Sequence, residues 1–194
     1  MKILSELKEY AQSEDIPIVQ AETMDFILDF LEKTAITSVL EIGTAIGYSA
    51  IAMSTVKSVQ RIVTLERNYG YAQIADVNIG RAGKDQVIEV IHQEALDYRT
   101  DEHFDLLFID GAKAQYQAFF DRFIANVDYV IVDNIDFHGM VENQSLTHNR
   151  STRALVKRLA KFKENILNDE DYKTRYYSIG DGVLLISKKQ RRNR

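Results

Sequence analysis

The stretch 38–49, SVLEIGTAIGYS, constrains the fold of this chain more than any other part of it. Its first half is an apolar strand pattern with Val39, Leu40 and Ile42 around an acid, and its second half turns through two glycines into an apolar helix pattern. Such a strand suits the interior of a parallel sheet, and glycines let the backbone approach a ligand that side chains would exclude. The first amides of the helix are then available to an anionic group. The stretch indicates a strand–turn–helix unit that holds a nucleotide-type cofactor, although many such units carry glycine for packing only.

Apolar patterns that alternate between strand and helix periodicity continue through most of the chain. This alternation is typical of a parallel sheet with helices on both faces. The patterns predict strands at 38–42, 60–65, 87–91, 104–109, 128–133, 175–179 and 183–187. They predict helices at 3–13, 22–35, 46–56, 69–82, near 95, at 113–125 and, after a polar loop at 134–149, at 150–168. The last two strands are joined only by the turn 180–182, so they must run antiparallel.

We therefore expect an α/β, Rossmann-like fold: a seven-stranded, mostly parallel sheet with helices on both faces and a C-terminal antiparallel strand. At 194 residues a single domain is the most economical organisation, with N-terminal helices in 1–35 and the sheet core in 36–194. The chain has no cysteine, which excludes disulfides and thiolate metal sites and fits a reducing cytoplasm. It has neither an export signal nor an apolar run of roughly 18 residues, so we expect a cytoplasmic protein without a membrane partner.

The net charge of −5 is distributed unevenly. Residues 145–194 carry 13 Lys and Arg against 5 Asp and Glu, so the last quarter is a basic region on an acidic body. A basic surface attracts phosphates, and a merely solvated helix face is the alternative. The basic side chains in question are Arg150, Arg153, Lys157, Arg158 and Lys161 on the predicted helix, followed by Lys163 and by the terminal Lys188, Lys189, Arg191, Arg192 and Arg194.

Acidic residues stand where the predicted strands stop, and open parallel sheets bind their ligands beyond this edge. Each acid alone could be a helix cap or a turn former, but their recurrence at one edge favours a site. Glu66 stands 19 residues after Gly47, where an acid commonly accepts hydrogen bonds from a ribose. The turn 43–47 lacks a third glycine, which makes an NAD-dependent dehydrogenase a distant alternative. The residues at these strand ends are Glu41, Glu66, Asp110, Asp133 and Asn134.

Asp110, Asp133 and Asn134 offer hard oxygen ligands, which suit Mg²⁺, Mn²⁺ or Ca²⁺. A divalent cation held by these three residues could bind two neighbouring oxygens of a substrate and lower the pKa of a hydroxyl among them. Lys113 follows Asp110 by three residues and is a candidate general base if it is partly desolvated near a cation. An ordinary surface lysine is the alternative for Lys113.

Three ordered motifs together resemble the cation-dependent class I O-methyltransferases, the family of catechol and caffeoyl-CoA O-methyltransferases. The motifs are EIGTAIGYS at 41–49, FIDGAK at 108–113 with Tyr116, and VDN at 132–134. The Asp-x-x-Lys and Asp-Asn pairs are more specific than the glycine turn, which many methyltransferases share. The resemblance extends over nearly the whole chain and implies the Rossmann-like fold of class I methyltransferases.

The resemblance also implies S-adenosylmethionine and a divalent cation, Mg²⁺ or else Mn²⁺ or Ca²⁺, as cofactors, and a homodimer. It implies that Lys113 is the catalytic base and that Asp110 serves both the cofactor pocket and the metal, with Asp133 and Asn134 as the other metal ligands. The methionine end of the cofactor would lie near Val19 and the ribose on Glu66. The cofactor-binding residues implied are Val19, Glu41, Gly43, Thr44, Gly47, Ser49, Glu66, Glu94, Ala95 and Asp110.

Within this family the chain is most similar to the bacterial branch that methylates 5-hydroxyuridine in the tRNA anticodon to 5-methoxyuridine. The similar features are the segments 16–20, 137–141 and 180–189 and the basic helix, but Asp136-Phe137-His138 has no clear match. This resemblance implies tRNA as substrate, held by Arg150, Arg153, Lys157, Arg158 and Lys161. A small catechol or caffeoyl-type acceptor is the alternative, because it also presents neighbouring oxygens. A non-catalytic RNA-binding module on the same fold is a more distant one.

Overall fold

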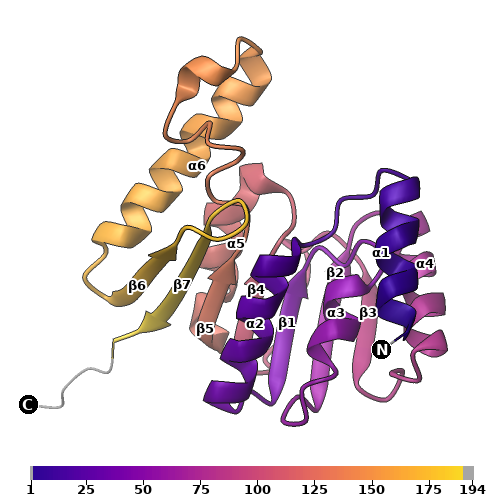
Figure 1. Ribbon diagram of the computed structural model, residues 1–194. Coiled ribbons are helices and arrows are strands. Elements are labelled where there is room, and N and C mark those ends of the chain that lie inside the picture. Colours follow the sequence, from indigo (N-terminus) through magenta and orange to yellow (C-terminus); the bar gives the residue numbers. More distant parts are fainter. Residues whose placement is uncertain (1, 190–194) are drawn as a thin grey trace, which may run out of the picture.

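A seven-stranded sheet forms the middle of the molecule, with its strands in the order β3-β2-β1-β4-β5-β7-β6 (Figure 1). The computed structural model describes residues 2–189. Strands β1 to β5 pair in parallel, whereas β7 pairs antiparallel with both β5 and β6. The predicted α/β class, the seven strands and the antiparallel C-terminal strand are thereby confirmed. The strands are β1 Ser38–Ile42, β2 Arg61–Glu66, β3 Ile88–His92, β4 Phe104–Ile109, β5 Val127–Val132, β6 Tyr172–Tyr177 and β7 Val183–Lys188.

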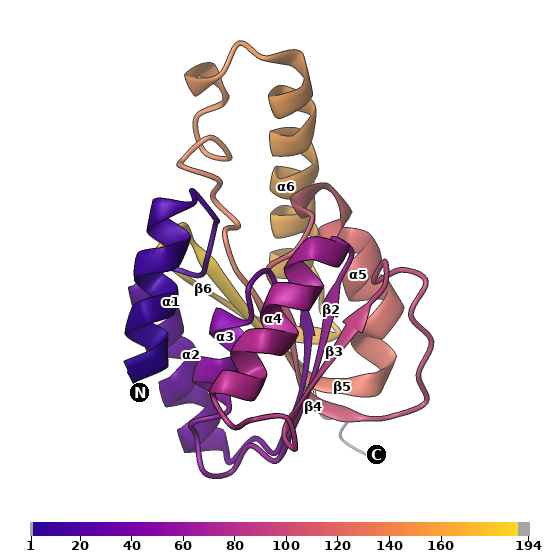
Figure 2. The same ribbon diagram turned by 90° about the vertical axis from the view of Figure 1, so that its right-hand side faces the viewer.

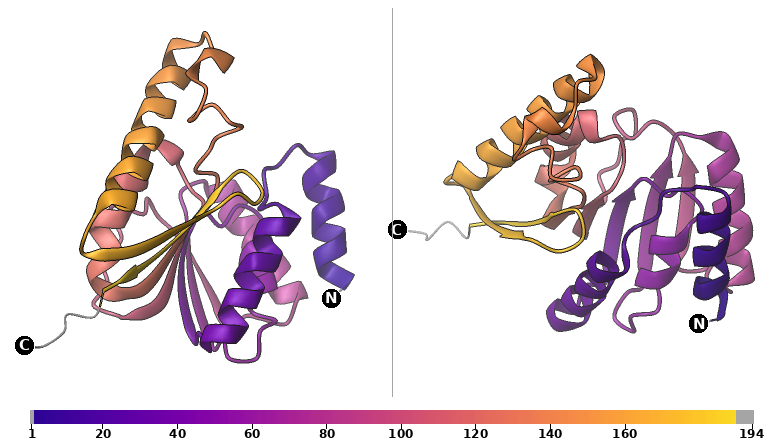
Figure 3. Two further views of the ribbon diagram at one scale, coloured as in Figure 1. Left: turned by 60° about the vertical axis from the view of Figure 1, so that its left-hand side comes forward. Right: turned by 45° about the horizontal axis from the view of Figure 1, so that its top comes forward.

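Helices cover both faces of the sheet, which Figure 3 shows between two helical layers. Helices α1 to α4 contribute to the core on one face, and α5 and α6 contribute to the core on the other. Successive strand residues point to opposite faces, so Val39 of β1 joins the first core and Leu40 joins the second. The helices are α1 Lys2–Ser13, α2 Ala21–Thr34, α3 Tyr48–Met53, α4 Tyr69–Arg81, α5 Tyr116–Phe123 and α6 Arg150–Asn168, with short 3₁₀ turns at Lys113–Gln115, Ile124–Asn126 and Gln144–Leu146.

Three predicted elements differ from the structure. Helix α3 begins at Tyr48 instead of residue 46, because Ala45 and Gly47 take left-handed backbone conformations with φ of 45° and 85°. It also ends at Met53, where the Ser54 hydroxyl bonds back to the Ile51 carbonyl at 2.7 Å. The helix predicted near 95 is wrong, because this segment makes only a turn with a hydrogen bond from Asp97 N to Glu94 O. Strand β6 begins at residue 172, three residues earlier than predicted.

Helix α6 and the loop before it rise above the carboxyl edge of the sheet (Figure 2). The Asn149 side chain caps the helix by accepting hydrogen bonds from the amides of Ser151 and Thr152. Its buried residues include Val156, Leu159 and Phe162, which form a stripe at helical spacing. The basic side chains therefore occupy the remaining faces of the helix. No helix within residues 2–189 is both long enough and apolar enough to cross a membrane.

Gly43 lies where the end of β1 meets the end of β4, and no side chain fits there. Its φ is +103°, and a Cβ atom at this position would lie 2.6 Å from the carbonyl oxygen of Asp110. We expect Gly43→Ala to lower the free energy of unfolding by about 3 kcal/mol or more, because both the backbone conformation and the contact are unfavourable. Gly83→Ala is the control: its φ is +64° with no atom near the added carbon, so only about 1 kcal/mol is expected. Urea unfolding of both variants measures the difference, and equal losses would contradict the assignment.

Candidate functional site

A cavity of about 540 Å³ opens at the carboxyl edge of the sheet, beyond the ends of β1, β2, β4 and β5. This is the edge at which the sequence predicted a site. Of the residues implied as cofactor-binding, the cavity is lined by Val19, Gly43, Ser49, Glu66, Glu94, Ala95 and Asp110. Lys113 and Asn134 line the same cavity. One space therefore joins the glycine turn to Lys113 and to two of the three predicted metal ligands, while the third, Asp133, is buried behind the lining.

Glu41, Thr44 and Gly47 lie behind this lining and support it. The Glu41 side chain is fully buried, and its carboxyl oxygens accept hydrogen bonds from Ser49 Oγ at 2.5 Å and Thr64 Oγ1 at 2.6 Å. Thr44 Oγ1 in turn lies 2.6 Å from Thr64 Oγ1. This hydroxyl network ties the glycine turn to β1 and β2. Glu41, Thr44 and Gly47 are not among the residues that line the cavity, and direct contact with a cofactor stays a prediction for these three residues.

Glu66 stands at the end of β2 and faces the glycine turn. Its two carboxylate oxygens accept the amides of Ala45 at 2.9 Å and Asn68 at 2.8 Å. The carboxylate therefore holds the left-handed Ala45 in place and is itself fixed at the cavity wall. Each oxygen retains a further lone pair, so Glu66 is able to accept hydrogen bonds from the hydroxyls of a ligand.

The predicted metal ligands converge at the ends of β4 and β5. Asn134 Nδ2 donates to Asp110 Oδ1 at 2.8 Å, and the Asn134 backbone amide donates to Asp133 Oδ1 at 2.7 Å. Burial and the neighbouring Asp133 raise the pKa of Asp110 to about 7, against the opposing influence of Lys113. Burial likewise raises the pKa of Asp133 to about 6. Two buried acids thus share one positive side chain, which leaves the site short of positive charge at neutral pH.

A divalent cation fits this donor set. Asp133 Oδ2 is buried and has no hydrogen-bond partner among the described residues, which is costly unless another ligand binds it. The carboxylate and amide oxygens are the donors that Mg²⁺ and Ca²⁺ prefer. Residues 2–189 contain no cluster of three His, Cys, Asp or Glu side chains, so Asn134 would have to serve as the third ligand. It would do so through its side-chain oxygen, because Nδ2 is the atom that donates to Asp110.

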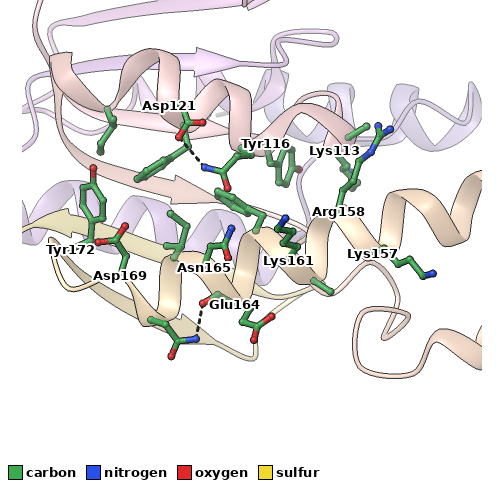
Figure 4. A pocket seen from close by; sticks show the side chains of 18 residues that line it. Lys113, Tyr116, Asp121, Lys157, Arg158, Lys161, Glu164, Asn165, Asp169 and Tyr172 are labelled. Atoms are coloured by element: carbon green, nitrogen blue, oxygen red, sulfur yellow. Dashed lines mark hydrogen bonds between the residues drawn. The ribbon is translucent and has the colours of Figure 1, made fainter.

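The basic residues of α6 separate into two groups outside this cavity. Lys157, Arg158 and Lys161 line a large groove between α5 and α6, with acidic Asp121, Glu164 and Asp169 also among its lining residues (Figure 4). Arg150 and Arg153 lie with His148 and Lys157 around a second surface hollow. Lys113 lines both this groove and the cavity of about 540 Å³, called the reaction cavity below, so the two spaces meet at this side chain. Arg191, Arg192 and Arg194 of the basic tail lie outside the described residues.

Phe137 and His138 also line the cavity and were not predicted as site residues. Their position shortly after Asp133-Asn134 is the signal that places them at the ligand-binding edge. Their backbone conformation, with φ of 46° and 57°, could not be read from the sequence. Gln115 and Phe119, from the turn before α5 and from α5 itself, were missed for a similar reason. The spacing of a helix places its residues on a face, but it does not say which end of the face reaches the cavity.

Comparison with known proteins defines the class of this chain. The family model described as O-methyltransferase matches residues 1–189, and the chain belongs to this family. This confirms the family resemblance of the three motifs. The structure resembles that of a putative caffeoyl-CoA O-methyltransferase from Staphylococcus aureus, with a TM-score of 0.91, 30% identity and coverage of 96% of this chain and 92% of the other. An O-methyltransferase from Bacillus cereus in complex with SAH gives a TM-score of 0.82 at 25% identity, covering 97% and 91%.

The alignments with curated relatives cover smaller parts of both chains. A catechol O-methyltransferase from Mycobacterium tuberculosis is 38% identical over 50% of this chain and 47% of its own. A second one, from Niastella koreensis, is 30% identical over 57% and 54%, so the chain spans about half the length of these relatives. A probable caffeoyl-CoA O-methyltransferase from Dictyostelium discoideum is 23% identical over 89% and 78%.

The Glu41 carboxyl makes the stability of the protein depend on pH. Burial, partly offset by the hydroxyls of Ser49 and Thr64, raises its pKa from 4.5 to about 7. The folded state keeps this proton up to about pH 7 whereas the unfolded state loses it near pH 4.5, so the free energy of unfolding falls as the pH rises between these values. Glu41→Gln should remove a loss on the order of 2–3 kcal/mol between pH 4.5 and 8. Urea unfolding in EDTA at several pH values tests this, and parallel profiles for wild type and variant would contradict it.

Proposed function

We propose that this chain transfers the methyl group of S-adenosylmethionine to a hydroxyl oxygen of an acceptor that carries a second oxygen beside it. The observation that carries the proposal is the single cavity that joins the glycine turn and Glu66 to Asp110, Asn134 and Lys113. Family membership and the SAH complex of the Bacillus cereus relative support the choice of donor. In the reaction the methyl group leaves the sulfonium sulfur and bonds to the acceptor oxygen, with S-adenosylhomocysteine and a proton as the other products.

In this proposal the cofactor extends along the edge of the sheet. Its methionine end lies against Val19, Gly43 and Ser49, the ribose hydroxyls bond to Glu66, and the adenine lies beside Ala95. The close approach of Gly43 to the Asp110 backbone leaves the turn open to the cofactor. This arrangement directs the methyl group toward Asp110 and Lys113, which lie in the same cavity.

Lys113 is the base that takes the acceptor proton. Once it carries the proton, the Lys113 side chain offsets the charges of the two buried acids, whose pKa values its positive charge lowers. Asp110, Asp133 and Asn134 would hold a divalent cation, which supplies positive charge that orients the acceptor oxygens and lowers the pKa of the hydroxyl. The Tyr116 hydroxyl, at the start of α5, donates a hydrogen bond to the Asp133 carbonyl at 3.0 Å. This bond fixes the backbone that carries Asp133 and Asn134. The chain thus contributes position and charge to the transfer.

For the acceptor we propose the 5-hydroxyl of 5-hydroxyuridine in a tRNA anticodon. Support comes from the basic residues of α6, which surround spaces outside the reaction cavity and would bind phosphates distant from the reacting base. Lys113, which lines both the groove and the cavity, makes the path between them continuous. A small phenol of the catechol or caffeoyl type is the second candidate, because the relatives from Niastella koreensis, Mycobacterium tuberculosis and Dictyostelium discoideum are named as O-methyltransferases of those acceptors.

An acceptor assay separates these two candidates. We expect the protein with Mg²⁺ and S-adenosylmethionine to convert 5-hydroxyuridine in tRNA to 5-methoxyuridine, measured by mass spectrometry of the digested nucleosides. Catechol and caffeoyl-CoA should react more slowly at equal concentrations, and EDTA should suppress every transfer. Methylation of the phenols with none of the tRNA would overturn the tRNA proposal and leave the O-methyltransferase proposal intact. Failure to bind S-adenosylmethionine in calorimetry would overturn both.

Two sets of substitutions separate the chemistry from acceptor binding. Asp133→Asn should lower kcat about a hundredfold or more while S-adenosylhomocysteine binding stays within a few-fold, since it removes a charge from the metal-binding residues only. Arg153→Glu with Lys157→Glu should weaken tRNA binding and reduce its salt dependence, with a smaller effect on kcat. Lys173→Glu with Arg175→Glu on β6 changes the net charge equally on another part of the surface and is the control. Equal effects of both charge reversals would argue against a specific role for α6.

A further inference from the structure

The segment 134–139, which follows β5, has an unusual backbone. Asn134, Phe137 and His138 have φ values of 56°, 46° and 57°, and Gly139 follows with 73°. Residues other than glycine rarely adopt this left-handed backbone conformation. Such conformations persist only where the surroundings hold them, and they concentrate at functional sites. The contacts that hold this segment therefore bear on what it does.

Asp136 lies in the middle of the segment and is bound from two other elements. Its Oδ1 accepts the Lys163 ammonium of α6 at 2.6 Å, and its Oδ2 accepts the Tyr176 hydroxyl of β6 at 2.5 Å. Lys163 also lies over the Tyr176 ring, 3.9 Å from its centre. The side chains of Asp136 and Lys163 are only 15% and 13% exposed, so this ion pair is largely shielded from water. A carboxylate that is shielded from water and accepts a hydrogen bond on each oxygen holds its backbone far more firmly than an exposed ion pair would.

The turn between β6 and β7 holds the same segment through its backbone. Ile135 N donates to the Gly182 carbonyl at 3.0 Å, and Asp136 N donates to the Asp181 carbonyl at 2.9 Å. The Asp181 side chain accepts the amide of His138 at 2.6 Å. A Cβ atom at Gly182 would lie 2.3 Å from the Asp136 carboxylate, so only glycine permits this contact. These bonds hold residues 135, 136 and 138, and Phe137, which lies between two of them, lines the cavity.

The segment presents three side chains to the reaction site. Asn134 at its start bonds to Asp110, and Phe137 and His138 line the cavity, with ring centres 5.5 Å apart. Two adjacent rings at the wall of a cavity suit a planar ring as ligand, through stacking and edge contacts. Both acceptors considered above, a 5-hydroxypyrimidine and a catechol, are planar rings with neighbouring oxygens.

We propose that Phe137 and His138 form the wall that recognises the acceptor ring, and that Asp136, held by Lys163 and Tyr176, is the positioning residue for that wall. The inference rests on the proposed methyl transfer for its choice of ligand. The positioning itself is a property of the protein without ligands. Loss of the Tyr176 hydroxyl loosens the segment, and the acceptor then binds less well although the cofactor turn is unchanged.

Tyr176→Phe tests the positioning step, with Tyr177→Phe as its matched control. The Tyr177 ring packs on Phe26, and its hydroxyl has no hydrogen-bond partner in residues 2–189, so the control removes an equivalent group from the same strand. Hydrogen exchange of the whole chain should show amides 135–143 exchanging on the order of tenfold faster in Tyr176→Phe, with β1 and α3 unaltered. Unaltered exchange, or equal effects of the two variants, would overturn the positioning role whether or not the protein proves to be a methyltransferase.

The recognition step is tested by a double-mutant cycle between Tyr176→Phe and His138→Ala. With 5-hydroxyuridine tRNA or catechol, whichever the wild type methylates, each single variant should raise the acceptor KM roughly five- to tenfold and leave kcat and S-adenosylhomocysteine binding within twofold. Because Tyr176 acts through the segment that carries His138, the rise in acceptor KM in the double variant should be smaller than the product of the two single rises. Independent effects, or a change confined to kcat, would overturn the proposal. If the wild type methylates neither acceptor, the proposed function fails, and binding of 5-hydroxyuridine and catechol to the SAH-loaded protein with Mg²⁺ supplies the same comparison as Kd values.

Discussion

The close approach of Gly43 to the backbone of Asp110 is the contact on which the cavity depends. Gly43 N donates to the Leu65 carbonyl at 3.0 Å, and Asp110 N donates to the Ile42 carbonyl at 3.0 Å, so the end of β1 is tied to both neighbouring strands. The glycine turn and the acidic residues therefore begin from one backbone junction. Their separation is set by strand spacing and not by flexible side chains, which is the precision that a transfer between two bound molecules requires.

Burial affects three carboxyls around this junction, but their surroundings differ. Glu41 has hydroxyl donors on both oxygens and is complete without a ligand. Asp133 keeps one buried oxygen without a partner among the described residues, and Asp110 shares its surroundings with Asp133 and Lys113. Desolvation makes all three harder to ionise. In the proposed cation site the added positive charge would offset this cost at Asp110 and Asp133, whereas the Glu41 carboxyl supports the glycine turn through its hydroxyl partners.

The fold followed from the sequence because its signals are repetitive. Strands β4 and β5 contain continuous apolar runs at 106–109 and 129–132, and parallel strands place the polar residues that follow them at one edge, where Glu66, Asp110 and Asn134 line the cavity. Local conformation was less accessible. The left-handed Ala45 delayed the start of α3, and the segment near 95 lacks the hydrogen bonds that would continue its turn into a helix. Glu41, one of the residues expected to bind the cofactor, is buried beside Ser49 and does not line the cavity, which could not be foreseen from the sequence because β1 is buried on both faces.

The basic side chains of α6 lie away from the proposed reaction site, and this separation distinguishes a large acceptor from a small one. Arg150 and Arg153 surround a hollow that shares no lining residue with the reaction cavity. A phenol that fills the cavity gains nothing from these side chains, because it does not extend to them. A polyanion gains from them even though they never meet the reacting ring, because each phosphate along its backbone releases counterions when it meets a cation. Under the proposed function the segment 134–139 would serve either acceptor equally: the ring would be recognised at the cavity wall, and the size of the molecule that carries it would be recognised along α6.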